Sequence, residues 1–285
     1  MNSMLSHSHD LFTGFAAVLG LLLGSFANVC IARMPEDRSI VWPGSQCPAC
    51  GKPIRPYDNI PLLSWALLRG KCRDCKTPIS PIYPAVELLM AALAFLLFRR
   101  IIPNGDDLDV AHLAAFVVAL LFTFMLVAQA FIDVRHYIIP DQFSIYAVPL
   151  GIVSAVLLTH LHAPNALTWR QSVIGALLGG GILAFIMGVY WLIRRREGMG
   201  MGDVKLLAMI GAFLGFWPAI PFVVFFASIA GTAVGIPMAI MQRKGFGTAL
   251  PFGPFLALGA ITYLLHGAEW TSRLFPGFQL LFSGT

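Results

Sequence analysis

Four acidic residues lie in or beside long apolar runs, where ionisable side chains are rare and usually functional. They are Glu87, Asp133, Asp141 and Asp203. Asp133 directly follows one apolar run, and Asp203 opens another within the sequence GMGMGDVKLL. Two carboxyl groups at one site share a proton, so the ionised one can activate water while the neutral one protonates a carbonyl oxygen or a leaving amine. Asp133 and Asp203 are therefore predicted to hydrolyse a peptide bond without a metal or a covalent intermediate.

Glycine recurs just before Asp203, at Gly198, Gly200 and Gly202. Glycine has no Cβ and lets another backbone approach closely. Hydrolysis requires an extended scissile segment, because an amide inside a helix is hydrogen-bonded and hidden. We therefore expect Gly200 and Gly202 to give a substrate strand access to the acid.

Each acid also has a structural interpretation. Asp133 can pair with Arg135 or His136 at the interface, and Asp203 can favour a helix N-terminus while pairing with Lys205. The remaining two acids are expected to be structural, as an N-cap for the fourth span (Asp141) and as a partner of an inward cation (Glu87). Composition alone does not separate a peptidase from a proton-coupled carrier.

Four of the five cysteines form two C-x2-C pairs, CPAC and CRDC, separated by 21 residues. Each pair can place two thiolates on one tetrahedral metal, and four thiolates make a closed structural zinc site. The predicted ligands are Cys47, Cys50, Cys72 and Cys75. A redox pair and a metal-free loop are the alternatives. Gly51 and Pro53 fit a knuckle turn, and Cys30 lies in an apolar run as a small core residue.

The segments that carry these residues belong to a membrane protein. Of the 285 residues, 58% are hydrophobic and 12% are charged, whereas soluble domains carry roughly 25% charged residues. We predict an all-α polytopic membrane protein in the lipid bilayer, with about eight transmembrane helices. The predicted spans are 11–32, 82–102, 112–132, 143–161, 172–193, 199–216, 218–240 and 252–267. Small-residue spacings suited to close packing in lipid recur at Gly20/Gly24, Gly175/Gly179, Gly211/Gly215 and Gly231/Gly235.

Lys and Arg cluster in alternate connections, which sets the predicted topology. Segment 33–81 is rich in them, connection 133–142 has Arg135, and later inside connections hold Arg194, Arg195, Arg196, Arg243 and Lys244. Both termini are then outside. The predicted organisation is a first span over 1–32, a cytoplasmic tetracysteine loop over 33–81 and a protease bundle over 82–285. The basic residues form no single patch despite the net charge of +5, so no nucleic-acid partner is expected.

Several motifs resemble those of the bacterial type IV prepilin leader peptidases, which also process the pseudopilins of type II secretion. They are GLLLGSFANVCIARMP (20–35), the paired C-x2-C loop, DVRHYIIPD (133–141), GMGD (200–203) and LPFGPFLALG (250–259). The G-x-G-D motif is also a hallmark of the wider intramembrane aspartyl proteases. The resemblance covers nearly the whole chain in order. It implies that Asp133 and Asp203 are catalytic and that Gly200 and Gly202 are active-site glycines.

The resemblance also implies the substrates and a second activity. The substrates are prepilins or pseudopilins with a short basic leader before a hydrophobic helix, cleaved after a glycine at the cytoplasmic face of the bacterial inner membrane. The second activity is N-methylation of the new N-terminal residue by S-adenosylmethionine, which is typical of members with the tetracysteine loop. No nucleotide fingerprint locates the pocket for that methyl donor.

Three other functions compete with the bifunctional enzyme. One is a peptidase without methyltransferase activity, in which the zinc loop serves for docking. Another is an ion-coupled carrier, which would typically have broken helices in two related halves. The third is a non-catalytic assembly scaffold built around the zinc loop.

Overall fold

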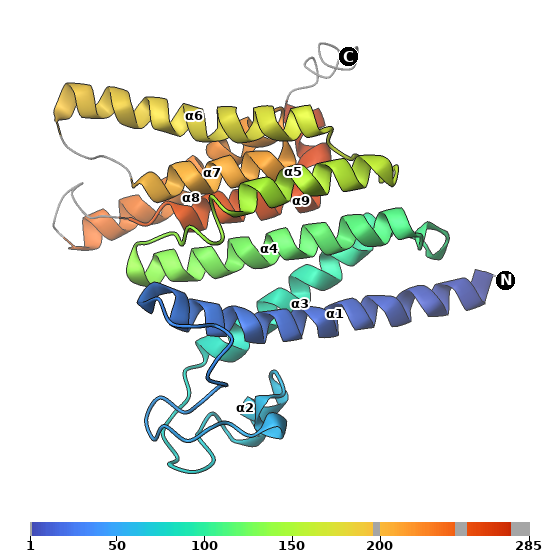
Figure 1. Ribbon diagram of the computed structural model, residues 1–285, viewed down its shortest axis with the longest axis vertical. Coiled ribbons are helices and arrows are strands. Elements are labelled where there is room, and N and C mark those ends of the chain that lie inside the picture. The colour runs from blue at the N-terminus through green and yellow to red at the C-terminus, as the bar shows by residue number, and fades with distance from the viewer. Residues whose placement is uncertain (1, 196–199, 243–249, 275–285) are drawn as a thin grey trace. The chain divides into compact units, whose positions relative to one another are not determined.

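The computed structural model describes residues 2–195, 200–242 and 250–274, and these residues form long apolar helices (Figure 1). The α-helices are α1 (Asn2–Arg33), α2 (Leu63–Leu67), α3 (Ile82–Ile101), α4 (Val110–His136), α5 (Ala147–His160), α6 (Trp169–Arg194), α7 (Met201–Leu214), α8 (Ala219–Gln242) and α9 (Gly253–Leu274). Short 3₁₀ turns lie at Met34–Glu36, Pro56–Asn59 and Gly105–Asp107. Within the described ranges there is no β-strand, so the prediction of an all-α protein is confirmed.

Each of the eight predicted apolar runs coincides with a helix, but the helices differ in length. Five are long and apolar enough to cross a membrane: α1, α3, α4, α6 and α8. A spanning helix needs about 20 residues, whereas α5 and α7 each have 14 and the apolar part of α9 is Gly253–Gly267. The chain is therefore a multi-pass membrane protein with five helices of full spanning length among the described residues.

The chain divides into two compact units, Met1–Ala128 and Gln129–Thr285. In the first unit, two glycines of α1 pack directly on α3. A Cβ at Gly20 would lie 2.7 Å from the Cβ of Ala94, and a Cβ at Gly24 would lie 2.6 Å from the Cα of Glu87. Only glycine permits such an approach of two helix backbones, so the small-residue spacing predicted for this helix is a packing device.

The second unit is built around the crossing of α6 and α7, which lie side by side (Figure 1). Gly175 of α6 and Gly211 of α7 meet backbone to backbone, and a Cβ at Gly179 would lie 2.6 Å from the carbonyl oxygen of Leu207. The Ser172 hydroxyl adds a hydrogen bond to the carbonyl oxygen of Ala212, at 2.6 Å. This crossing fixes the position of α7, the helix that carries Asp203.

Replacing Gly211 with alanine is expected to disrupt this crossing, because the new Cβ would overlap the backbone carbonyl of Gly175. We expect the free energy of unfolding to fall by about 3 kcal/mol, at the upper end for overpacking. Gly181→Ala is the matched control on α6, since its Cβ would meet no atom within 4 Å. Circular dichroism during unfolding in detergent measures both variants. If Gly211→Ala and Gly181→Ala unfold with the same free energy, the tight crossing of α6 and α7 would be contradicted.

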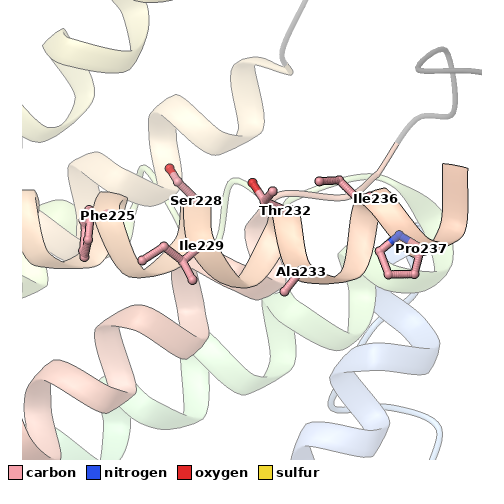
Figure 2. Close-up of a pocket in the computed structure, with 7 residues that line it drawn as sticks. All are labelled: Phe225, Ser228, Ile229, Thr232, Ala233, Ile236 and Pro237. Carbon is pink, nitrogen blue, oxygen red and sulfur yellow. The ribbon is translucent and has the colours of Figure 1, made fainter. Parts of the chain in front are cut away.

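Helix α8 presents an open apolar groove of about 600 Å³ along one side. Figure 2 shows the seven lining residues along this one helix, from Phe225 to Pro237. Its two hydroxyl-bearing residues are Ser228 and Thr232, and the Ser228 hydroxyl donates to the carbonyl oxygen of Val224 in the same helix. A surface of this character suits lipid chains, which require that backbone and hydroxyl groups be satisfied within the helix.

Some of the basic residues used for the topology prediction, Arg196, Arg243 and Lys244, lie outside the described residues, as does Gly198. The boundaries predicted for the three domains stay a prediction.

Candidate active site

Asp133 lies near the C-terminal end of α4, where the chain turns sharply. The helix ends at His136, and Tyr137 adopts a left-handed conformation with φ 56°. The N–H of Tyr137 donates to the carbonyl oxygen of Asp133 at 2.9 Å, which closes the last turn of the helix. The Asp133 residue is 6% exposed. Asp133 therefore lies at a helix end and is buried there.

The Asp133 side chain has a partner that sequence reasoning did not assign. The N–H of Gly253, the first residue of α9, donates to its Oδ2 at 3.1 Å. The first amides of a helix have no partner within the helix and favour negative charge. Contrary to the structural interpretation, no ion pair joins Asp133 to Arg135 or His136, and both of these described side chains are exposed. The carboxyl group is held by a backbone donor instead.

Asp203 is the third residue of α7, with Gly200 at the N-cap. Its N–H donates to the carbonyl oxygen of Gly200 at 3.2 Å, and the residue is 8% exposed. Because α7 begins at Met201, the acid lies in the first turn of the helix. Within the described part of the chain, no donor bonds to the Asp203 carboxyl group.

The two acids come together within the second unit. Asp133 and Asp203 lie within electrostatic range of each other, although they come from different helices. Ile139, in the turn after α4, lies between the glycine that precedes Asp203 and the glycine that binds Asp133. Its side chain would lie 3.1–3.3 Å from a Cβ at Gly202 and 3.0 Å from a Cβ at Gly253. The site thus contains two buried carboxyl groups, two glycines without side chains and one apolar side chain.

Lys205 does not pair with Asp203, contrary to the structural interpretation. Its Nζ lies 2.6 Å from Oδ1 of Asp141. Asp141 is also not the N-cap of α5, because that helix begins at Ala147 after a six-residue turn, with Tyr146 at its N-cap. The ion pair therefore ties the turn between α4 and α5 to α7 and leaves Asp203 without its expected cation.

Glu87 binds a backbone amide of the first unit rather than a cation. Its Oε2 accepts the N–H of Leu62 at 2.8 Å, and the Ser25 hydroxyl also bonds to it. Leu62 has a left-handed φ of 60°. Glu87 is buried at the start of α3. It anchors the backbone of the cysteine loop through Leu62. The expected partner, an inward cation, is thus replaced by this backbone amide.

The four predicted metal ligands converge in the first unit. The Sγ atoms of Cys47, Cys50, Cys72 and Cys75 all lie within 4.8 Å of one another, and those of Cys47 and Cys75 are 3.8 Å apart. Zinc–sulfur bonds of about 2.3 Å in a tetrahedron separate the sulfurs by about 3.8 Å. All four cysteines are free of disulfides. The cluster therefore fits a tetrahedral metal ion.

Each cysteine pair sits in the same kind of knuckle. The carbonyl oxygen of Cys47 accepts the N–H of Gly51 at 2.9 Å. In the same way, the carbonyl oxygen of Cys72 accepts the N–H of Lys76 at 3.1 Å. Both of those residues have a left-handed φ, of 70° and 59°. The predicted knuckle at Gly51 is confirmed, and Lys76 adopts the corresponding conformation without being glycine.

Contacts outside the knuckles support the cysteine cluster. Hydrogen bonding to Thr77 lowers the pKa of Cys75 to about 6, which favours the thiolate that a metal binds. The Arg73 guanidinium makes two hydrogen bonds to Asp58, at 2.7 and 2.6 Å, and these hold the pKa of that carboxyl group below its usual range. The loop is thus braced by a bidentate pair from within the second knuckle.

Comparison with known proteins identifies the chain. Residues 18–101 match the bacterial peptidase A24 N-terminal domain, and residues 119–236 match the type IV leader peptidase family. The chain is 38% identical to a prepilin leader peptidase/N-methyltransferase of Burkholderia pseudomallei, covering 90% of this chain and 86% of that protein. It belongs to the type IV leader peptidase family. Proteins of the same name from Myxococcus xanthus and Aeromonas hydrophila are 42% and 36% identical, over 85% and 94% of this chain and 68% and 95% of those proteins. No solved structure is significantly similar.

As a type IV leader peptidase, the chain is an enzyme, which favours the peptidase over the carrier and the scaffold. The matched N-terminal domain contains all four cysteines, and the matched peptidase segment contains both Asp133 and Asp203. Gly253 lies beyond that segment. The LPFGP motif around it resembles the family, but no property of the motif indicates that its amide bonds to an acid far away in sequence.

Proposed function

We propose that this type IV leader peptidase removes the basic leader of prepilins or pseudopilins through a catalytic pair formed by Asp133 and Asp203. The observation that supports this proposal is the burial of both carboxyl groups within electrostatic range of each other, beside two glycines. Buried carboxyl groups at one site share a proton, which provides a base and an acid together.

The residues of the site divide the reaction between them. One carboxyl group takes a proton from water, which attacks the carbonyl carbon of the leader's last residue, a glycine. The other carboxyl group protonates the carbonyl oxygen. As the C–N bond breaks, the first carboxyl group gives the proton it took from water to the leaving amine, and the second recovers its proton from a hydroxyl of the tetrahedral intermediate. The Gly253 amide keeps Asp133 oriented, Gly202 lets Ile139 pack closely, and Gly200, whose Cβ position is open, leaves room for an extended substrate. The new N-terminus leaves as the start of the hydrophobic helix.

We also infer that the cysteine cluster holds a structural zinc ion. Cys72→Ser is expected to lose the bound metal, because three remaining thiolates no longer close the site and structural zinc contributes about 10–16 kcal/mol in small zinc domains. Metal content by atomic absorption and protease sensitivity of segment 33–81 measure the effect. Cys30→Ala is the control, since Cys30 is buried in α1 away from the cluster. Full metal content in Cys72→Ser would contradict the proposed ligand set.

The second proposed activity is methylation of the newly exposed amine. S-adenosylmethionine, when bound, supplies the methyl group. An α-amino group has a pKa of about 7.7–8.0, so mild desolvation makes it nucleophilic. A mixed polar and apolar pocket of about 290 Å³ lies between α1 and the loop that follows it, and includes Ser25, Phe26 and Arg33. Ligand pockets span about 300–1,000 Å³, and we propose this pocket, just below that range, for part of the methyl donor.

A single assay tests both activities. Purified protein is incubated with a prepilin peptide and with S-adenosylmethionine carrying a deuterated methyl group, and the products are weighed by mass spectrometry. We expect a leader ending in glycine and a mature fragment heavier by one labelled methyl group. Equilibrium binding of the labelled donor to the protein without peptide gives an independent readout. Cleavage without added mass and without donor binding would reject the methyltransferase proposal.

The proposed location is the bacterial inner membrane, with eight crossings and the catalytic pair at the cytoplasmic face. The shorter helices α5, α7 and α9 would then cross where the bilayer thins or the helix ends are shielded by protein. The support is Arg135 in the connection next to Asp133 and the three arginines 194–196 in the connection before Asp203.

A further inference from the structure

Ile139 lies between the glycine that precedes Asp203 and the glycine whose amide binds Asp133. Cβ atoms built at Gly202 and Gly253 would lie 3.1 Å from its Cβ and 3.0 Å from its Cδ1, respectively. The Cβ at Gly253 would also lie 2.7 Å from Oδ2 of Asp133. One branched side chain therefore spans from the glycine before Asp203 to the glycine that binds Asp133.

The turn that carries Ile139 is held from both sides. Before it, the left-handed Tyr137 closes α4 onto the carbonyl oxygen of Asp133. After it, the Ser144 hydroxyl donates to the carbonyl oxygen of Pro140 at 2.9 Å, and Asp141 pairs with Lys205 of α7 at 2.6 Å. An isoleucine has few rotamers. Its side chain is thus held against Gly202 and Gly253.

We propose that Ile139 is a specificity-determining residue that restricts the substrate residue on the acyl side of the scissile bond to glycine. This inference rests on the proposed function of Asp133 and Asp203. A scissile carbonyl must come within about 2.6–3.2 Å of a group that exchanges a proton with it, and Ile139 faces the same Gly253 position as the Asp133 carboxyl group. Gly202 and Gly253 have no side chains that could occupy this space. A methyl group on the substrate residue therefore meets Ile139.

The expected selectivity follows from the size of one methyl group. An additional methylene-sized group in an apolar site changes kcat/KM by about 10–200-fold. Ile139→Ala removes the Cγ and Cδ atoms that face both glycines and opens space for one substrate methyl. Ile139→Val removes only Cδ1, the atom nearest Gly253, so its effect is smaller.

The test compares two prepilin peptides that differ only in glycine or alanine before the scissile bond. We expect the wild type to prefer glycine, and Ile139→Ala to reduce the glycine-to-alanine ratio of kcat/KM by about 10-fold or more. Ile139→Val should reduce it by less. Ile138→Ala is the matched control, because the neighbouring isoleucine is 45% exposed, and its ratio should equal that of the wild type. The ratio comes from one preparation, so a partly unfolded sample does not alter it.

An unchanged ratio in Ile139→Ala would overturn the proposal, as would loss of cleavage of both peptides by a variant with normal helix content. If Ile139→Ala does not fold, the ratio of Ile139→Val decides in the same way. Failure of the underlying function is distinct, since it would appear as cleavage that survives Asp133→Asn or Asp203→Asn in the glycine peptide.

Discussion

Asp133→Asn and Asp203→Asn each lower kcat/KM for leader removal by about 10²–10⁴-fold, the contribution of a positioned acid or base. Asparagine keeps the shape of the side chain and can neither take nor give the proton. Because the two acids act as one unit, the double variant should lose little more than either single one. Cleavage of a prepilin peptide, followed by mass spectrometry at fixed pH, measures all three.

The matched control is Asp106→Asn, at an exposed position in the first unit, where cleavage should equal that of the wild type. Adding hydroxylamine to the wild-type reaction separates direct attack by water from an acyl-enzyme route. Direct attack releases the leader with a free carboxyl group, whereas an acyl-enzyme would be trapped as a hydroxamate. Activity retained by either single variant, or a trapped hydroxamate, would end the assignment of the pair.

Gly253→Ala is the second large expected effect. Its Cβ would lie 2.7 Å from Oδ2 of Asp133 and 3.0 Å from Cδ1 of Ile139, so the carboxyl group must move. A displacement of about 1 Å at a reacting group can cost about 10²-fold in rate. We expect kcat to fall by that amount while KM changes little, because a proton-transferring group acts in the transition state rather than in ground-state binding. Steady-state kinetics with the glycine peptide measures both constants.

Gly231→Ala is the control for the helix pair α8 and α9. Its Cβ would make ordinary contacts with Phe255 of α9, at 3.6 Å, so both kinetic constants should stay within twofold of the wild type by an order-of-magnitude estimate. A Gly253→Ala enzyme with normal kcat would show that the contact of the Gly253 amide with Asp133 does not orient the acid.

The membrane class, the helices and the clustering of the four cysteines could be predicted from the sequence because they depend largely on local properties. Hydropathy over about 20 residues decides whether a helix lies in lipid, and each of the eight predicted runs coincides with a helix. The spacing within CPAC and CRDC places two thiolates on one turn, whatever the rest of the chain does. Acids in apolar runs such as Asp133 and Asp203 are equally visible, because their cost is set by their immediate neighbours.

The partners of those acids were decided by the tertiary structure. From the sequence, Lys205 was a possible ion-pair partner of Asp203, only two residues away. In the structure, Lys205 pairs with Asp141 instead. The amide that holds Asp133 comes from Gly253, 120 residues further along the chain. Ile139 reaches both glycines only because a left-handed Tyr137 turns the chain back. Hydropathy and spacing act over one or two helical turns, whereas a side chain's partner depends on which helices cross and at what depth.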